Sequence, residues 1–211
     1  MQRRNVIRLV ALSLLSAPLA AAGSRYAAAQ GTVHVDAILH DPDAPVTGNP
    51  RGDVTIVAFL DYNCPYCKKS APDLARVVKE DGRIRLVYKD WPILTEASVY
   101  GAQLALAANY QGKYLEVHDA LMAIPGRRIP EEVMLKAVQA TSVNLDRLMN
   151  DLQTRIGDIA ALLKRNNSQA NALGLQGTPT YLVGPLLAST LDYASFKRAI
   201  AEARRQQANA K

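Results

Sequence analysis

The sequence contains very little cysteine, and this scarcity limits the chemistry open to it. Only Cys64 and Cys67 occur among 211 residues. With no third cysteine, neither thiol can belong to a larger framework of structural disulfides. The three histidines are scattered along the chain, and a closed zinc site takes about four ligands, so no second pair completes such a site. The two thiols therefore act as a pair or with another molecule.

A concentrated basic surface is also missing, although the whole chain has a net charge of +6. Residues 1–29 hold four arginines and no acidic residue, so the remainder carries 21 basic and 19 acidic side chains. Nucleic-acid binding would require a clustered excess of positive charge. We therefore expect no nucleic-acid partner. The chain beyond residue 29 is long enough for one domain with a hydrophobic core, and it contains no internal repeat.

The sequence also lacks an apolar run long enough to cross a membrane. The stretch Leu9–Ala22 falls short of the about 20 residues that a span requires. It follows the basic segment Gln2–Arg8 and precedes small residues that end at Ala29, which is the layout of a secretory signal peptide. We expect residues 1–29 to be removed on export, leaving a periplasmic protein without a membrane span. Arg3-Arg4 is compatible with a twin-arginine signal.

Alternating strand and helix patterns predict an α/β domain over residues 51–207, after a lead-in segment at 30–50. The lead-in has one short apolar patch, Val33–Val35, and we interpret the segment as extended and as including one strand. The run Val54–Leu60 is almost continuously apolar and β-branched, as in a strand buried on both faces. The other elements expected outside the region 94–174 are a helix at about 65–79, strands at 84–88, 180–183 and 186–188, and a helix from about 193.

Between the second strand and the late strands, the apolar period is helical over about residues 94–174. One apolar stripe there runs from Tyr114 to Leu121 and includes His118. A histidine on such a stripe is usually packed in the core, so we do not assign His118 to a metal site. A second apolar face runs from Ile156 to Leu173, and Gly174 is a natural stop for that helix. The region predicts a helical insertion within the α/β domain.

The cysteine pair follows the first strand directly, so Cys64 lies at the start of the next helix. A spacing of three residues places both sulfurs near one side of the first turn, close enough to form a disulfide. Backbone N–H groups and the helix dipole at this end favour an anion, and such settings lower a thiol pKa from ~8.5 to between ~3.5 and ~7.5. We interpret Cys64 as the exposed attacking and leaving thiol, and Cys67 as the thiol that resolves the mixed disulfide.

Two other uses of the pair stay open at this point. A purely structural disulfide would enclose only two residues and would therefore stabilise the fold little. Two thiolates also suit Cu(I), so a copper-handling protein is a candidate from a different class. For the thiol chemistry itself we expect neither a metal nor a cofactor.

Several motifs together resemble a known family. Cys64-Pro65-Tyr66-Cys67 after a hydrophobic strand is similar to the site of the DsbA-type thiol-disulfide oxidoreductases, which have the thioredoxin fold. The suppressor-of-copper-sensitivity branch of that family, with its CPYC motif, is the branch it resembles most. The other motifs that carry the likeness are Pro72 in the first helix, Gly177-Thr178-Pro179-Thr180 before a late strand, and the segments 41–46, 89–94 and 111–114.

The resemblance implies a thioredoxin fold with a helical insertion between the second strand and the strand that follows Pro179. From the residues alone the Thr178–Pro179 bond would be trans, since only about 5–6% of X–Pro bonds in folded proteins are cis. In the family this bond is cis and lies beside the cysteine pair. The likeness also implies that Thr178 and Pro179 bind the substrate chain in a strand-like manner, and that Pro65 and Tyr66 tune thiolate stability.

One position departs from the family pattern. Family members commonly carry a buried acidic residue six positions before the first cysteine, thought to help move the proton of the resolving thiol, and this chain has Ala58 there. Either another group, such as a water or a nearby polar side chain, serves as the base, or exchange through Cys67 is slower. Asp61, three residues before Cys64, is better explained as a cap for the turn between strand and helix.

We predict an exported thiol-disulfide oxidoreductase that forms disulfides in cysteine-containing exported proteins and is reset by a redox partner. Tyr66 replaces the histidine of strongly oxidising relatives, and Thr178 also resembles isomerases, so an isomerase or reductase of the same fold is the alternative. Isomerases of this superfamily are usually oligomers with an oligomerisation segment before the catalytic domain. After cleavage at Ala29 only residues 30–50 precede the domain, so we expect a monomer.

Overall fold

The computed structural model describes residues 34–210, so the expected signal peptide at 1–29 lies outside the described residues. The described chain forms a five-stranded sheet with the strand order β1-β3-β2-β4-β5. The strands are β1 Val46–Gly48, β2 Val54–Leu60, β3 Ile84–Asp90, β4 Thr180–Val183 and β5 Leu186–Ser189. The helices are α1 Val35–Leu39, α2 Pro65–Asp81, α3 Glu96–Asn109, α4 Tyr114–Ala123, α5 Glu131–Gln139, α6 Leu145–Thr154, α7 Ile156–Ala172 and α8 Tyr193–Asn209.

The sheet mixes one parallel pair with three antiparallel pairs. β2 and β3 run parallel and are joined by α2, as a parallel pair requires a crossover connection. β1, β4 and β5 each pair with a neighbour in the antiparallel direction. The strands β2 and β4 are therefore adjacent although the helical insertion separates them in sequence. The architecture is the expected α/β thioredoxin fold.

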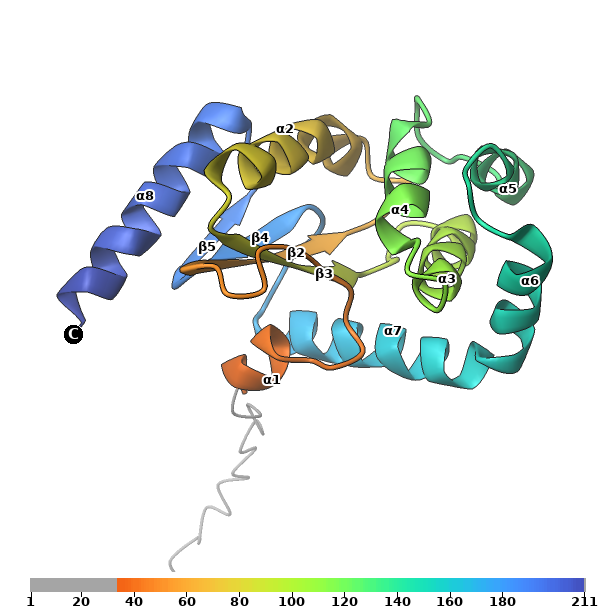
Figure 1. The fold of residues 1–211 in the computed structure, drawn as a ribbon, viewed down its shortest axis with the longest axis horizontal. Helices are drawn as coiled ribbons and strands as arrows, with labels where there is room; N and C mark the ends of the chain where they lie inside the picture. The colour runs from red at the N-terminus through yellow and green to blue at the C-terminus, as the bar shows by residue number, and fades with distance from the viewer. Residues whose placement is uncertain (1–33, 211) are drawn as a thin grey trace, which may run out of the picture. The chain divides into compact units, whose positions relative to one another are not determined.

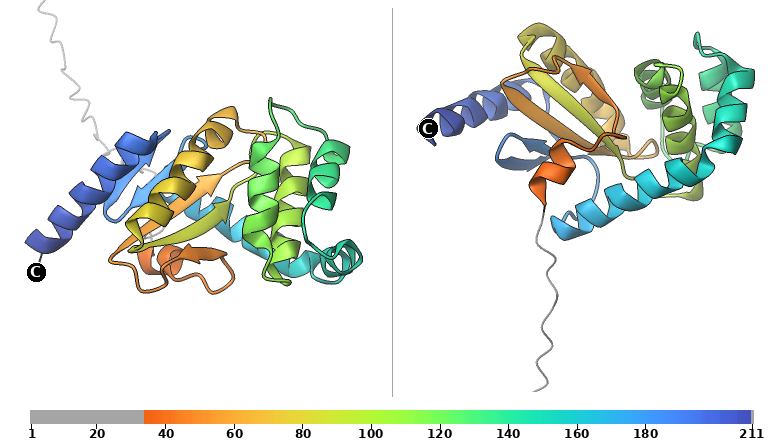
Figure 2. Two further views of the ribbon diagram at one scale, coloured as in Figure 1. Left: turned by 45° about the horizontal axis from the view of Figure 1, so that its top comes forward. Right: turned by 60° about the horizontal axis from the view of Figure 1, so that its bottom comes forward.

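Helices cover both faces of this sheet (Figure 1). α2 and α8 lie on one face, while α1 and α7 lie on the other, and the two further views agree (Figure 2). The helices α3–α6 gather beyond one end of the sheet and α7 leads the chain back beneath it, which confirms the predicted helical insertion. Among the described residues, no helix combines the length and the apolarity that a membrane crossing would need.

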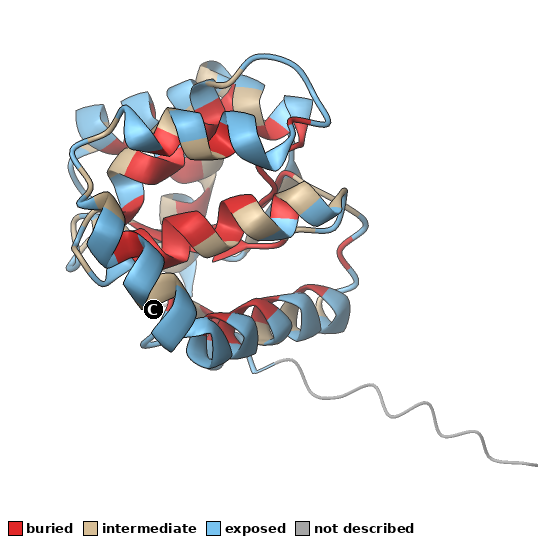
Figure 3. Cartoon of the chain, turned by 90° about the vertical axis from the view of Figure 1, so that its right-hand side faces the viewer, coloured by how far each residue is buried: buried red, intermediate tan, exposed pale blue. Residues whose placement is uncertain are grey.

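The central strand β2 is buried on both faces, as its apolar run predicted. Ile56 and Leu60 point into the larger core cluster with α2, α8 and the insertion, while Val57 and Phe59 point into a second cluster with α1 and α7. Figure 3 shows the buried residues of the helices concentrated on their inward sides. His118 is 2% exposed and belongs to this interior, which confirms its interpretation as a core histidine.

The expected strand of the lead-in is β1, which pairs with β3. Two details of the sequence-based prediction require correction. The lead-in is not extended throughout, since Val35 begins the helix α1, where Val35, Ile38 and Leu39 have helical spacing and Ile38 is buried in the second core cluster. Ile156 is 42% exposed because it is the first residue of α7, so the buried face starts only at Ile159.

A buried ion pair attaches the lead-in segment to the domain. The Lys89 ammonium on β3 is fully buried and lies 2.7 Å from an Asp41 carboxylate oxygen. Arg165 on α7 donates to both oxygens of the same carboxylate at 2.9 Å. A buried charge without its partner is strongly destabilising. The Asp41 carboxylate thus compensates the buried charge of Lys89. It also connects the lead-in segment with β3 and α7.

Replacing Asp41 by Asn should lower the free energy of unfolding by about 3–5 kcal/mol, because Lys89 would remain buried without a carboxylate. Asp43→Asn is the matched control, since Asp43 contacts Arg165 at the surface, where ion pairs contribute about 0–1 kcal/mol. Urea unfolding of both variants measures the difference. Equal losses in the two variants would contradict this role of Asp41.

Candidate functional site

The turn between β2 and α2 is organised by the buried carboxylate of Asp61. One oxygen accepts the Asn63 N–H at 2.7 Å, and the other accepts the N–H groups of Ile93 and Leu94 at 2.8 and 3.0 Å. The Asp61 carbonyl accepts the Cys64 N–H at 3.1 Å. These bonds confirm Asp61 as the residue that shapes the turn, and they place Cys64 at the N-cap of α2.

Asn63 fastens the same turn to the helical insertion. Its side-chain oxygen accepts the backbone N–H of Ile129, and its amide group donates to Thr95 Oγ1 at 2.9 Å. Asn63 is 2% exposed, so its polar groups require these partners. The sequence prediction gave Asn63 no role. Its place beside the first cysteine was the only available signal, because its partners are more than thirty residues away.

Both cysteines are free thiols, and their sulfurs make different contacts. The Cys67 backbone N–H donates to Cys64 Sγ at 3.3 Å, and the Cys64 thiol donates to the Thr178 carbonyl at 3.1 Å. Cys64 is only 2% exposed and Cys67 is 0% exposed. The expectation of an exposed Cys64 is therefore wrong in this state, because the loop before β4 lies against its sulfur. Within the motif, Pro65 and Tyr66 are exposed to solvent, Tyr66 by 60%.

The pKa values of the two thiols shift in opposite directions. The hydrogen bond from the Cys67 thiol is the main cause that lowers the pKa of Cys64 to about 6, with further help from Thr178 and from backbone N–H groups, and against the effect of burial. Burial raises the pKa of Cys67 well above its usual range. At neutral pH Cys64 is thus mostly a thiolate, the form that attacks disulfides and that no longer donates to the Thr178 carbonyl, whereas Cys67 keeps its proton.

The loop that contains Thr178 and Pro179 completes the site. The Thr178–Pro179 bond is cis, as the resemblance implied. Thr180 follows at the start of β4 and pairs with Phe59 of β2, and this pairing brings the loop next to the N-terminus of α2. The structure therefore brings Cys64, Cys67 and Thr178 together, as the family resemblance implied.

Beside the cysteine pair, a cavity of about 640 Å³ lies between α2 and the end of α4. Pro65 and Pro72 line it on one side, and Met122 and Ile124 on the other. Lys68 reaches across and donates to the Gly126 carbonyl at 3.3 Å. Within residues 34–210, histidine, cysteine and carboxylate side chains nowhere gather in groups of three or more that could hold a metal ion.

The fold and this cysteine site together define a class, the thioredoxin-like proteins with a CxxC pair beside a cis-proline loop. The thioredoxin family model matches residues 40–202. That range covers most of the chain. The protein therefore belongs to the thioredoxin family.

Solved structures of related proteins share this fold. A thioredoxin-like oxidoreductase from Silicibacter pomeroyi superposes with a TM-score of 0.75 at 37% identity, over 81% of this chain and 97% of that one. The thiol-disulfide exchange protein alpha-DsbA2 from Wolbachia pipientis gives a TM-score of 0.74 at 27% identity, over 79% and 90%. The catalytic domain of Proteus mirabilis ScsC gives a TM-score of 0.70 at 24% identity, over 80% of this chain and 93% of that one. At this identity the likeness shows a shared fold.

Curated relatives include proteins of two kinds. The chain is 33% identical over 147 residues to the Na(+)/H(+) antiporter NhaA 1 of Salinispora arenicola, a match that covers 68% of this chain and only 22% of that protein. It is 26% identical over 165 residues to a probable disulfide bond formation protein D of Bacillus cereus, covering 72% of this chain and 75% of that one. The chain therefore spans about a fifth of the antiporter that it matches.

Replacing Cys67 by Ala should raise the pKa of Cys64 above about 6, since the Cys67 thiol supplies the main hydrogen bond that stabilises the thiolate. The ultraviolet absorbance of the thiolate, followed during a pH titration, gives this value. Cys67→Ser is the matched control, because it retains a hydroxyl donor and should shift the midpoint less. A midpoint that Cys67→Ala leaves unchanged would show that the backbone and Thr178 stabilise the thiolate without Cys67.

Proposed function

We propose that this protein is an exported thiol-disulfide oxidoreductase that forms disulfides in other exported proteins. The observation that carries the proposal is the asymmetry of the thiol pair. Cys64 lies at the N-cap of α2 with a lowered pKa, whereas burial raises the pKa of Cys67, one turn further along the helix. One thiol is thus suited to exchange with an external molecule, and the other to exchange only with its neighbour.

In the oxidising direction, a substrate thiolate attacks the Cys64 sulfur of the Cys64–Cys67 disulfide. The Cys64–Cys67 bond breaks, a mixed disulfide forms with Cys64, and the Cys67 thiolate takes a proton. A second substrate thiolate then attacks the substrate sulfur of the mixed disulfide and releases Cys64 as a thiolate. Because the pKa of Cys64 is low, Cys64 is a good leaving group, which favours transfer of the disulfide to the substrate.

Resetting the enzyme requires a partner that carries a disulfide. The Cys64 thiolate attacks this disulfide, forms a mixed disulfide and releases one partner thiol. Cys67 then loses its proton and attacks the Cys64 sulfur, which restores the Cys64–Cys67 bond and releases the second partner thiol. The partner is reduced and this protein is oxidised, so electrons and protons balance.

The substrate chain would lie across the loop at Thr178 and Pro179. An extended peptide adds to such a backbone through main-chain hydrogen bonds and places its cysteine beside Cys64. Tyr66, 60% exposed, and the cavity next to Pro65 offer apolar contacts for the residues around that cysteine. Contacts of this kind suit varied unfolded sequences better than one fixed motif.

Two relatives support thiol-disulfide exchange as the reaction and disulfide formation as its direction. The names of the Wolbachia and Bacillus proteins describe thiol-disulfide exchange and disulfide bond formation. The signal-like segment at residues 1–29 supports export to the periplasm, an oxidising compartment where disulfides form and persist. We propose a monomer as the working form.

A refolding assay tests the proposed direction. The oxidised protein should introduce disulfides into reduced, unfolded ribonuclease, because Cys64 leaves readily from the mixed disulfide. Cys64→Ala should abolish this activity, and Cys67→Ala should also abolish it, because without Cys67 the protein cannot carry a disulfide to transfer. Activity is followed as ribonuclease regains its catalytic function.

Three parallel assays separate the alternatives. Faster recovery of scrambled ribonuclease than of reduced ribonuclease would indicate an isomerase. Rapid reduction of insulin would indicate a reductase. Tight Cu(I) binding by the reduced protein, with no exchange in any assay, would overturn the proposal in favour of copper handling.

A further inference from the structure

A second cavity, also of about 640 Å³, continues the one beside the cysteine pair. It lies between α2, β3, α4 and the turn after β1, and Val78, Leu86 and Leu115 give it apolar walls. Ala75 and Asp119 line both cavities, so the two meet at the middle of α2. Together they form one groove, which begins at the cysteine motif and ends at the C-terminus of α2.

One stripe of α2 lines this groove from end to end. Its members recur at spacings of three and four residues, and they are Pro65, Lys68, Pro72, Ala75, Lys79 and the C-cap Gly82. The opposite stripe, with Leu74 and Val77, is buried in the core. α2 has 17 residues and is therefore about 25 Å long. An extended chain advances about 3.3 Å per residue, so the groove has room for about seven residues of such a chain.

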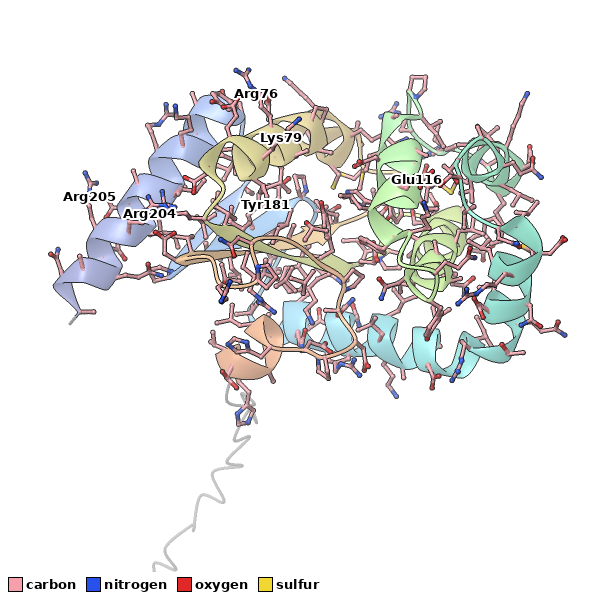
Figure 4. The ribbon with its side chains drawn as sticks, viewed as in Figure 1. Arg76, Lys79, Glu116, Tyr181, Arg204 and Arg205 are labelled. Atoms are coloured by element: carbon pink, nitrogen blue, oxygen red, sulfur yellow. The ribbon has the colours of Figure 1, made fainter. Side chains whose placement is uncertain are left out.

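The groove carries an excess of positive charge. Lys68, Lys69 and Lys79 line it from α2, and Figure 4 shows Lys79 on the half of the helix farther from the cysteine motif. The lining contains one carboxylate, that of Asp119 on α4. Within residues 34–210, none of these four side chains forms an ion pair. The positive charge of the lysines is thus available to an occupant of the groove.

We propose that this groove binds an extended segment of the substrate next to its cysteine, and that it favours segments with apolar and acidic residues. The apolar walls remove apolar side chains of an unfolded chain from water. The lysines attract carboxylates, an effect that acts mainly on the rate of association. The inference rests on the thiol exchange proposed above, and it names the class of substrate sequence that this exchange prefers.

The positions of the acidic residues follow from the geometry of the helix. Lys69 and Lys79 lie five and fifteen residues beyond Cys64, which corresponds to about 8 and 22 Å along α2. At about 3.3 Å per residue, these distances match about two and seven residues of an extended chain. An acidic residue about two positions from the substrate cysteine should therefore lie near Lys69, and one about seven positions away should lie near Lys79.

Peptides with one cysteine, activated as a disulfide with 2-thiopyridine, test the groove on the reduced protein. The Cys64 thiolate attacks the peptide sulfur, and the bond from that sulfur to the thiopyridyl group breaks. The thiopyridyl sulfur leaves as a thiolate and takes a proton from water, which gives 2-thiopyridone. The absorbance of 2-thiopyridone yields the second-order rate constant. Each peptide has an apolar tail of about eight residues, placed before the cysteine in one series and after it in the other.

Glutamates at positions two and seven of the tail should make the reaction about tenfold faster than lysines at the same positions, in one of the two series, at low salt. One glutamate at either position should give about threefold. At about 1 M salt the screening length falls to about 3 Å, so the preference should largely disappear. Equal rates for the two tails in both series, or faster reaction of the lysine tails, would overturn the groove.

Charge reversal in the protein localises the preference. Lys79→Glu should abolish the advantage of a glutamate at position seven and keep that at position two, and Lys79→Gln should have an intermediate effect. Lys164→Glu is the matched control, because Lys164 is exposed on α7, across the sheet from α2. It changes the net charge equally and should alter neither preference. An unchanged preference in Lys79→Glu, or an equal loss in Lys164→Glu, would overturn the groove.

Two further measurements complete the test. The small disulfide 2,2′-dithiodipyridine has no tail, so it should react with all these variants at rates within about twofold. A change beyond this in Lys79→Glu would overturn the assignment, because it would indicate an effect on Cys64 itself. Sedimentation shows whether a second copy covers the groove. A dimer of the unmodified protein that Lys79→Glu dissociates would also overturn the proposal.

The outcome for the groove is distinct from the outcome for the proposed function. The groove is tested by a stoichiometric reaction of the reduced protein, so it can be measured even in a protein that oxidises no ribonuclease. Oxidation of ribonuclease without any preference among the tails would overturn only the groove. A preference among the tails without oxidation of ribonuclease would overturn only the oxidase role.

Discussion

The contact between the Cys64 sulfur and the Thr178 carbonyl is the interaction on which the rest of the site depends. It joins two residues that are 114 positions apart in the sequence. The contact exists because β4 pairs with β2, so the end of the loop at Thr178 meets the start of α2. Cys64 is thereby held between a helix end that favours an anion and the backbone of the cis-proline loop, where we propose that a substrate chain binds. The same packing covers the sulfur and leaves Cys67 in the interior.

The remainder of the fold supports this contact from three directions. Asp61 shapes the turn that leads into α2, and Asn63 fastens that turn to the helical insertion. On the opposite face of the sheet, Asp41 binds Lys89 and Arg165 and holds the lead-in segment in place. These polar groups are buried, so each stabilises the structure only because its partner is present. The insertion is therefore a structural support for the cysteine motif as well as a wall of the neighbouring cavity.

Local patterns in the sequence identified the parts of the molecule that local chemistry determines. The apolar run of β2 and the helix start at Cys64 could be read from neighbouring residues, whereas the cis bond at Thr178 was implied only by the family resemblance. Other features depend on contacts between distant segments. The strand β1 is recognisable only from its pairing with β3, and the burial of Cys64 only from the position of Thr178. The buried hydrogen bond between the Tyr181 and Ser70 hydroxyls likewise depends on the pairing of β4 with β2. Asn63 was missed for the same reason.

The fold lowers the pKa of Cys64 and so stabilises its thiolate, and we propose that this makes the disulfide form a strong oxidant. Equilibration of the protein with glutathione buffers of known ratio measures the reduction potential of the Cys64–Cys67 pair. A stabilised thiolate favours the reduced form, so the potential should lie well above the about −270 mV of thioredoxin and toward the about −120 mV of DsbA. A potential at or below about −270 mV would contradict the claim, because such a pair would reduce substrate disulfides instead of forming them.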